Sequence, residues 1–183
     1  MYSKNTINRQ INRPECIVIT GISSGGKSTL ARALHLSLGW PLFSLDNYWI
    51  RGGRRLYTVI RGRRVRVFDD PNLYDGEKLA IDAHRHERAI IEGFCAMAYH
   101  GISAAATVHL HIDIPWDEAR SRRVSRDARP SDASWLLLGP EHSERTVGFQ
   151  RNMPGCVIMD GMSDPAVLLA TAIGVIENRD GAP

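Results

Sequence analysis

The stretch from Gly21 to Thr29 reads GISSGGKST and matches the spacing G-x-x-x-x-G-K-S without a mismatch. Glycine-rich backbone can turn its N–H groups inward to hold phosphate oxygens, and a helix that starts there adds the positive end of its dipole. The Lys27 ammonium can reach the β- and γ-phosphates of a nucleotide, and the Ser28 hydroxyl can hold Mg²⁺. A turn without a ligand is the alternative. However, an apolar run precedes the loop and a helical pattern follows it, as a phosphate-binding loop requires.

Two acidic residues occupy positions where the rest of such a site is expected. Glu92 lies at the end of the apolar run AIIEG, from where a carboxylate can hold Mg²⁺ through a water. Asp46 follows the run PLFSL, and the carboxyl ends of parallel strands face the ligand crevice in α/β proteins. Asp46 can accept the proton of an attacking hydroxyl or orient its oxygen, although the position also suits an ordinary turn residue. The absence of an NKxD segment argues against a GTPase.

The elements that must position these residues follow from the apolar patterns. Short β-branched runs predict buried strands, and leucines four residues apart after the loop predict a helix that Gly39 ends. The predicted strands cover residues 15–20, 41–45, 89–93, 107–114 and 155–160. The predicted helices cover 27–38, 75–86, 115–126 and the segment from Pro165 onward, with further helical parts in 95–106 and 134–150. This alternation predicts an α/β fold with a mostly parallel five-stranded sheet flanked by helices, in one domain over residues 1–183.

Arginines gather in two segments, residues 51–66 and 120–129. In the first, the runs LYTVI and RVRVF around Gly62 predict a hairpin. In the second, arginines three or four residues apart share one helix face. Each cluster could instead be a solvated basic surface, which is the usual role of a charge run.

The bulk composition sets limits on the function. The net charge is only +3, which argues against a nucleic-acid partner, and residues 1–13 are a polar segment that predicts a flexible tail rather than a signal peptide. The longest apolar run, 166–176, is too short to span a bilayer. The three cysteines have no metal-binding spacing, and we expect them to be reduced thiols in the cytoplasm. Because the apolar run is short, we expect no membrane attachment. His109 and His111 would share one strand face, and we expect core positions rather than a metal site.

Four blocks, in order, resemble the uridine kinase and phosphoribulokinase group of P-loop kinases. The first is the loop GISSGGKST, and the second is SLDNYW, which is similar to the family's Asp-x-Phe-Tyr segment. The third is VFDDPNLYD, which is similar to Asn-Phe-Asp-His-Pro-x-x-Phe-Asp. The fourth is EARSRRVSRD, which is similar to Arg-Arg-x-x-Arg-Asp of the family's lid. The spacing from Glu92 to Asp113 also fits, and the resemblance spans residues 15 to 160. It implies transfer of the γ-phosphate of ATP, with Mg²⁺, to a hydroxyl of a small molecule. It also implies a substrate lobe at residues 47–70 and a lid at residues 120–135.

The motifs and the resemblance together predict the site residues. The catalytic residues are Lys27, Asp46, Arg123 and Arg126. The ATP-binding residues are Gly21, Ser23, Ser24, Gly25, Gly26, Lys27, Ser28, Thr29 and Arg122. The residues at the acceptor are Asp46, Trp49, Asp69, Arg64 and Arg66, with Asp69 on the hydroxyls of a sugar. The metal-binding residues are Ser28 and Glu92.

The chain also departs from the family. ARPSDASW replaces a second arginine pair after Arg-Asp, and Asn47-Tyr48-Trp49 replaces a Ser-Phe-Tyr-like run. A uridine kinase-like nucleoside kinase is the first interpretation. A kinase for a sugar phosphate, nicotinamide riboside or pantothenate is the second. A nucleotide-binding regulatory or nucleic-acid-binding protein that uses the arginine hairpin is the third, and the oligomeric state, including a homo-oligomer, stays open.

Overall fold

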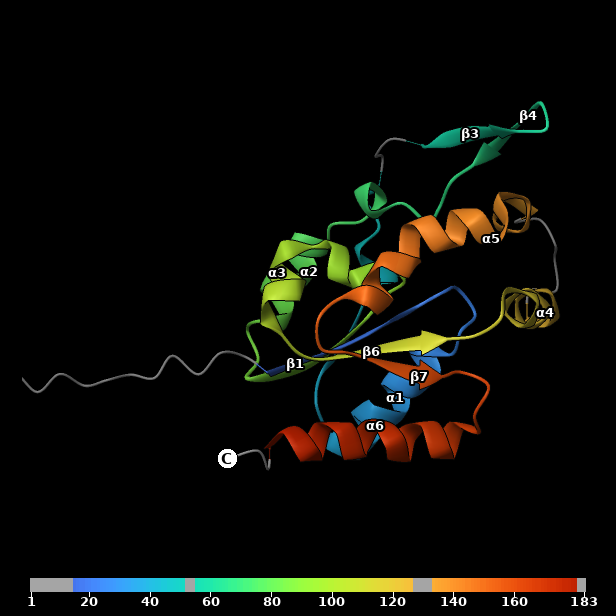
Figure 1. The fold of residues 1–183 in the computed structure, drawn as a ribbon. Coiled ribbons are helices and arrows are strands. Elements are labelled where there is room, and N and C mark those ends of the chain that lie inside the picture. Colours follow the sequence, from blue (N-terminus) through green and yellow to red (C-terminus); the bar gives the residue numbers. More distant parts are fainter. Residues whose placement is uncertain (1–14, 52–54, 127–132, 181–183) are drawn as a thin grey trace, which may run out of the picture.

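The structure is a computed structural model that describes residues 15–51, 55–126 and 133–180, so the predicted tail at residues 1–13 lies outside it. Its central sheet has five parallel strands in the order β2-β5-β1-β6-β7 (Figure 1). The strands are β1 (Glu15–Gly21), β2 (Leu42–Ser44), β5 (Arg88–Glu92), β6 (Ala106–Asp113) and β7 (Cys156–Asp160). The predicted α/β fold with a five-stranded parallel sheet is confirmed.

Helices cover both faces of this sheet. They are α1 (Lys27–Leu38), α2 (Gly76–Ala83), α3 (His100–Ala105), α4 (Trp116–Arg126), α5 (Ala133–Val147) and α6 (Pro165–Asp180). Alternate residues of β1 point to opposite faces, so Ile17 and Ile19 pack with α1 and α6 while Cys16 and Val18 pack with α2 and α3. In Figure 1, α1 and α6 lie below the sheet and α2, α3 and α5 above it. The sheet is therefore buried on both faces, as an all-parallel sheet requires.

The observed elements differ from the predicted ones in detail. The second strand is shorter because Leu45 starts the 3₁₀ turn η1 (Leu45–Tyr48) and buries its side chain completely against Gly93. Residues 95–106 divide into the turn η3 (Ala96–Ala98) and α3. Further short turns are η2 (Pro71–Leu73) and η5 (Gly148–Asn152). A break at Gly139, where φ is 73°, and the following Pro140 divide α5 into two pieces.

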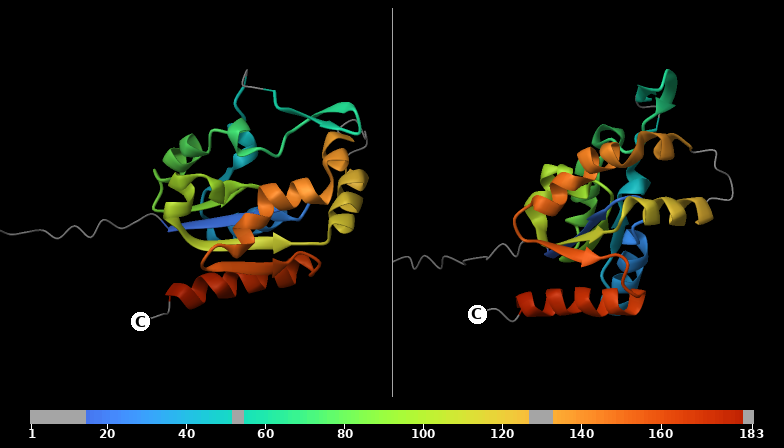
Figure 2. Two further views of the ribbon diagram at one scale, coloured as in Figure 1. Left: turned by 45° about the horizontal axis from the view of Figure 1, so that its top comes forward. Right: turned by 45° about the vertical axis from the view of Figure 1, so that its right-hand side comes forward.

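The predicted hairpin is present as the strands β3 (Tyr57–Ile60) and β4 (Arg63–Arg66). Positive φ angles at Arg61 and Gly62 give the two-residue turn that matches the twist of a hairpin. Its inner face buries Val65, and the outer face leaves Val59 exposed. Figure 2 shows the hairpin projecting from the body above the N-terminal part of α5. None of the described helices is long and apolar enough to cross a membrane.

Candidate active site

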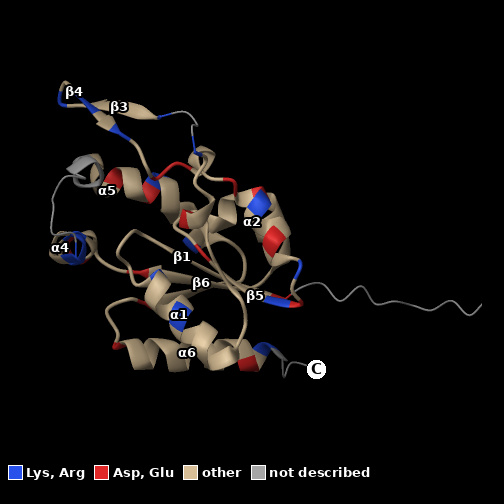
Figure 3. Cartoon of the chain, turned by 180° about the vertical axis from the view of Figure 1, so that it is seen from behind, with Lys and Arg blue, Asp and Glu red and all other residues tan. Residues whose placement is uncertain are grey.

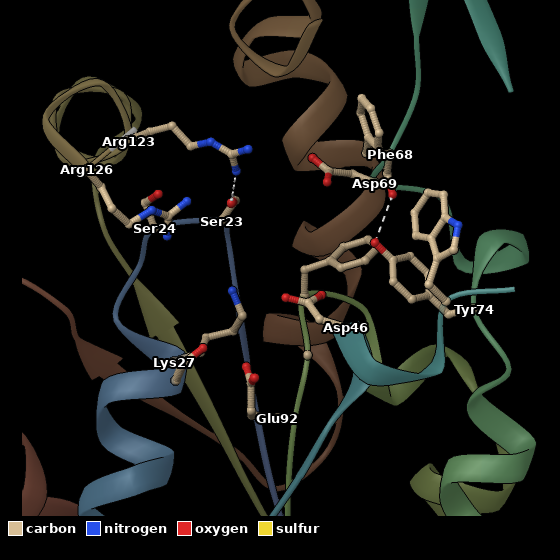
Figure 4. Close-up of a pocket in the computed structure, with 14 residues that line it drawn as sticks. Ser23, Ser24, Lys27, Asp46, Phe68, Asp69, Tyr74, Glu92, Arg123 and Arg126 are labelled. Carbon is tan, nitrogen blue, oxygen red and sulfur yellow. Dashed lines mark hydrogen bonds between the residues drawn. The ribbon is translucent and has the colours of Figure 1, made fainter. Parts of the chain in front are cut away.

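The carboxyl ends of the parallel strands surround a pocket of about 420 Å³ (Figure 4). Lys27 at the start of α1, Asp46 after β2 and Glu92 at the end of β5 all line it. The sheet thus brings together residues that lie far apart in the sequence. The full lining is Ser23, Ser24, Lys27, Ser28, Asp46, Trp49, Phe68, Asp69, Tyr74, Glu92, Gly93, Phe94, Arg123 and Arg126.

The loop between β1 and α1 has the shape of a phosphate cradle. Gly21 has a φ of 136°, and a Cβ atom there would lie 2.4 Å from the Ile112 carbonyl oxygen, so the close approach of β1 to β6 requires glycine. Gly26 has a φ of 103° just before the first turn of α1, and Ser24 also has a positive φ. Successive backbone groups in such conformations turn their N–H bonds towards one side, which makes an anion-binding concavity.

Lys27 is buried at the floor of the pocket, with 8% of its surface exposed. Its Nζ atom donates a hydrogen bond to the Ile22 carbonyl at 2.9 Å. Burial lowers the pKa of Lys27, and the negative charges of Glu92, Asp46 and Asp69 oppose this shift. The lysine therefore lies where three carboxylates favour its charged form, and its ammonium can move from the carbonyl to a phosphate oxygen.

The residues predicted to hold Mg²⁺ fit that ion. Ser28 and Glu92 line the same pocket, and both offer the oxygen atoms that Mg²⁺ prefers. Within residues 15–51, 55–126 and 133–180, no three His, Cys, Asp or Glu side chains form a group that could hold a metal alone. This arrangement suits Mg²⁺, which proteins usually hold through one or two side chains and the phosphates of a substrate.

The other half of the pocket is aromatic and acidic. Asp46 and Asp69 reach into it, beside four rings that contact one another: Phe68, Trp49, Tyr74 and Phe94. The ring centroids of Trp49 and Tyr74 are 5.1 Å apart at nearly a right angle, and Tyr74 donates a hydrogen bond to the Phe68 carbonyl at 3.2 Å. Rings provide flat apolar surface and carboxylates accept hydroxyl protons, so this half suits a molecule that has both features.

The arginines of α4 lie along the opposite rim. Arg123 donates a hydrogen bond to the Ser23 hydroxyl at 2.7 Å, and Arg126 lines the pocket beside it. Arg122 instead bonds Glu118 and the Gly161 carbonyl. It borders a second space of about 250 Å³, which is lined by Ser24, Gly26, Lys27, Ser28, Thr29, Arg122 and Arg126. Residues 127–132 of the predicted lid lie outside the described residues.

The structure does not bring the two predicted hairpin arginines into the pocket. Arg64 lies over the Tyr57 ring at 3.9 Å, on the exposed face of the hairpin. Arg66 lies 4.5 Å from the Phe68 ring centre and 5.7 Å from that of Trp49. It therefore contacts the aromatic wall, the four rings of Phe68, Trp49, Tyr74 and Phe94, without itself lining the pocket. In Figure 3, the blue segments of the ribbon show that Lys or Arg residues lie in both β4 and α4.

A buried polar cluster lies beneath the phosphate loop. The Thr20 hydroxyl, one residue before Gly21, is 2.8 Å from His109 Nε2 and 2.9 Å from His111 Nδ1. Both histidines are buried, as predicted for core positions. Burial is the main cause that lowers the pKa of each to about 4, so both are neutral at pH 7.

Several pocket residues were not predicted from the sequence. Phe68 and Tyr74 belong to the block VFDDPNLYD, which assigned a role to Asp69 alone, and Phe94 follows the strand end at Glu92. Their positions next to predicted residues were the available signal. Ser44 was missed because its contact with Glu92 depends on the pairing of β2 with β5.

Comparison with known proteins supports the fold. No family model matches the chain, and no curated protein does. Similar solved structures include a gluconokinase from Sinorhizobium meliloti 1021, with 16% identity over 91% of this chain and 93% of that chain and a TM-score of 0.59.

Two further structures are similar at 14% identity: a deoxyadenosine kinase from M. mycoides with bound dATP and a shikimate kinase from Bacteroides thetaiotaomicron. Each match covers 88% of this chain and 98% of the other, with a TM-score of 0.56. At such identities the likeness shows a shared fold, and the chain has the α/β fold of P-loop kinases.

Proposed function

We propose that this protein is an ATP- and Mg²⁺-dependent kinase that transfers the γ-phosphate to a hydroxyl of a nucleoside, in the manner of the uridine kinase group. The observation that carries the proposal is one pocket with two chemically different halves. A phosphate loop with Lys27 lies on one side, and two carboxylates with four aromatic rings lie on the other. A kinase requires both, because donor and acceptor must meet in line.

Each residue has a role that follows from its position. Lys27 and the loop N–H groups would bind the phosphates of ATP, and Arg123 and Arg126 would stabilise the charge of the transferred group. Asp46 would accept the proton of the attacking hydroxyl. Ser28 and Glu92 would hold Mg²⁺, which neutralises phosphate charge when bound. ATP as donor and three free cysteines support a reducing compartment, the cytoplasm.

The charges of the pocket favour an uncharged acceptor. Asp46 and Asp69 line the acceptor half, while the cations among the lining residues are Lys27, Arg123 and Arg126 of the phosphate half. A base could lie against the aromatic rings, and Asp69 could accept two hydroxyl protons from a ribose. A carboxylated or phosphorylated acceptor would bring a negative charge towards two others, which is unfavourable.

A kinase for another metabolite is the second candidate, because the gluconokinase and shikimate kinase share this fold. A screen with Mg-ATP would decide between them by measuring ADP release with nucleosides, gluconate, shikimate, pantothenate, nicotinamide riboside and sugar phosphates. We expect the highest kcat/KM with a nucleoside, and its loss in Asp69→Asn. Turnover of an anionic acceptor alone would contradict the nucleoside proposal. Salt-dependent RNA or DNA binding without turnover of any metabolite would contradict the kinase itself.

A further inference from the structure

Ser44 is the last residue of β2, and the parallel pairing places it directly beside Glu92 of β5. Its hydroxyl donates a hydrogen bond to Glu92 Oε1 at 2.5 Å. Hydrogen bonds that a carboxylate group accepts are roughly twice as strong as those between neutral groups. The sheet register itself therefore brings a donor to the carboxylate at the pocket floor.

The environment of Glu92 makes this donor important. Glu92 is only 5% exposed, and a buried carboxylate needs hydrogen-bond donors. The nearby Lys27 directs its own hydrogen bond to the Ile22 carbonyl. Across the described part of the chain, Ser44 is the one side chain that forms a hydrogen bond with Glu92. The bond uses one lone pair of Oε1 and leaves Oε2 available for a further ligand.

We propose that Ser44 is a positioning residue for metal binding: its hydroxyl fixes the Glu92 carboxylate in the orientation that holds Mg²⁺ with the nucleotide. The inference rests on the proposed function, because it requires Glu92 to bind the metal. Partners that orient a ligating group typically change metal affinity by 10- to 100-fold when they are removed. The competing explanation is a bond that only joins β2 to β5 and affects stability without affecting the metal.

The test measures Mn²⁺ binding to the protein–ADP complex by electron paramagnetic resonance, without turnover. We expect Ser44→Ala to weaken Mn²⁺ binding about tenfold. Ser44→Thr keeps the hydroxyl and suits a strand, so it should bind Mn²⁺ nearly as the wild type does. ADP affinity in EDTA should be the same in all three proteins. The matched control is Thr107→Ala, which removes a strand hydroxyl that donates to the Cys16 carbonyl at 3.1 Å, remote from the pocket.

Folding of each variant is checked by circular dichroism and thermal unfolding. If Ser44→Ala does not fold, Ser44→Cys preserves the volume with a weak donor and should show the same loss of Mn²⁺ affinity. Wild-type Mn²⁺ affinity in a folded Ser44→Ala or Ser44→Cys protein would overturn the inference, and so would an equal loss in Thr107→Ala. If the expected Mn²⁺ pattern appears but no nucleoside is phosphorylated, the proposed acceptor fails while the role of Ser44 stands.

Discussion

The two ends of the pocket, the phosphate end and the acceptor end of the proposed function, are built in different ways. At the phosphate end, Lys27 and Glu92 are 8% and 5% exposed and are held by the first turn of a helix and the end of a central strand. At the acceptor end, Trp49 and Phe68 come from connecting segments, and the exposed hairpin supports them through Arg66. Under the proposed function, regular elements would thus hold the phosphates and the metal, and the acceptor would be recognised by segments that can vary.

The largest expected effect tests whether Asp46 belongs to the chemical step. Asp46→Asn preserves the shape of the side chain but removes its capacity to accept a proton. We expect kcat to fall about 10³-fold while ATP affinity stays unchanged, which steady-state kinetics and ATP titration would measure. A rise in the acceptor KM at unchanged kcat would limit Asp46 to binding the acceptor and remove it from the chemical step.

The arginines of α4 should also belong to the phosphate end. Arg123→Ala removes a guanidinium that lines the pocket, and we expect kcat to fall about 10²-fold because the transferred group loses a stabilising charge. Arg120→Ala is the control, since Arg120 is exposed on the same helix and does not line the pocket. Equal kinetics for the two variants would show that α4 presents only a basic surface.

The buried histidines beneath the phosphate loop should make stability depend on pH. His109 and His111 have pKa values lowered to about 4, chiefly by burial. At His111, Arg151, His109 and Lys27 lower the pKa further and Asp113 opposes them. An unfolded histidine titrates near pH 6.5, so between pH 6.5 and pH 4 the unfolded chain binds more protons than the folded chain. The stability that these neutral histidines contribute is therefore present above about pH 6.5 and is lost as pH falls towards 4.

This dependence can be measured by urea unfolding at pH 7 and pH 5. The unfolding free energy of the wild type should fall by about 2 kcal/mol more than that of His109→Gln, which removes one of the two groups. His84→Gln is the control, because His84 is exposed and should leave the fall unchanged. An equal fall in His109→Gln and the wild type would contradict a neutral buried imidazole.

The smallest expected effect tests whether the hairpin supports the aromatic wall of the pocket. Arg66→Ala removes a cation that lies over Phe68 and Trp49, and such contacts contribute about 1 kcal/mol. We expect the acceptor KM to rise about fivefold at unchanged kcat, equally for charged and uncharged acceptors. Arg64→Ala, on the same hairpin face but over Tyr57, should have no effect. A loss confined to phosphorylated acceptors in both variants would instead favour direct binding of an acceptor phosphate.

The same contrast explains what the sequence could predict. The phosphate loop is continuous in the chain, so its spacing alone predicts Lys27 and Ser28, and the strand ends predict Asp46 and Glu92. The alternation of apolar runs with helical patterns predicts the five-stranded sheet. The Ser44–Glu92 contact and the aromatic wall depend on strand register and on packing between distant segments, which no local pattern contains. For the same reason, the sequence could not predict the contact of Arg66 with that wall.

The hydrogen bond from Lys27 to the Ile22 carbonyl gives the ammonium group a partner within the loop itself. Under the proposed function, a phosphate would compete with this carbonyl for the ammonium, so weakening of the bond to Ile22 would offset part of the free energy gained from the phosphate. Release of ADP would restore the full hydrogen bond to the carbonyl. We expect this competition to keep product affinity modest, so that the loop can release one nucleotide and accept the next.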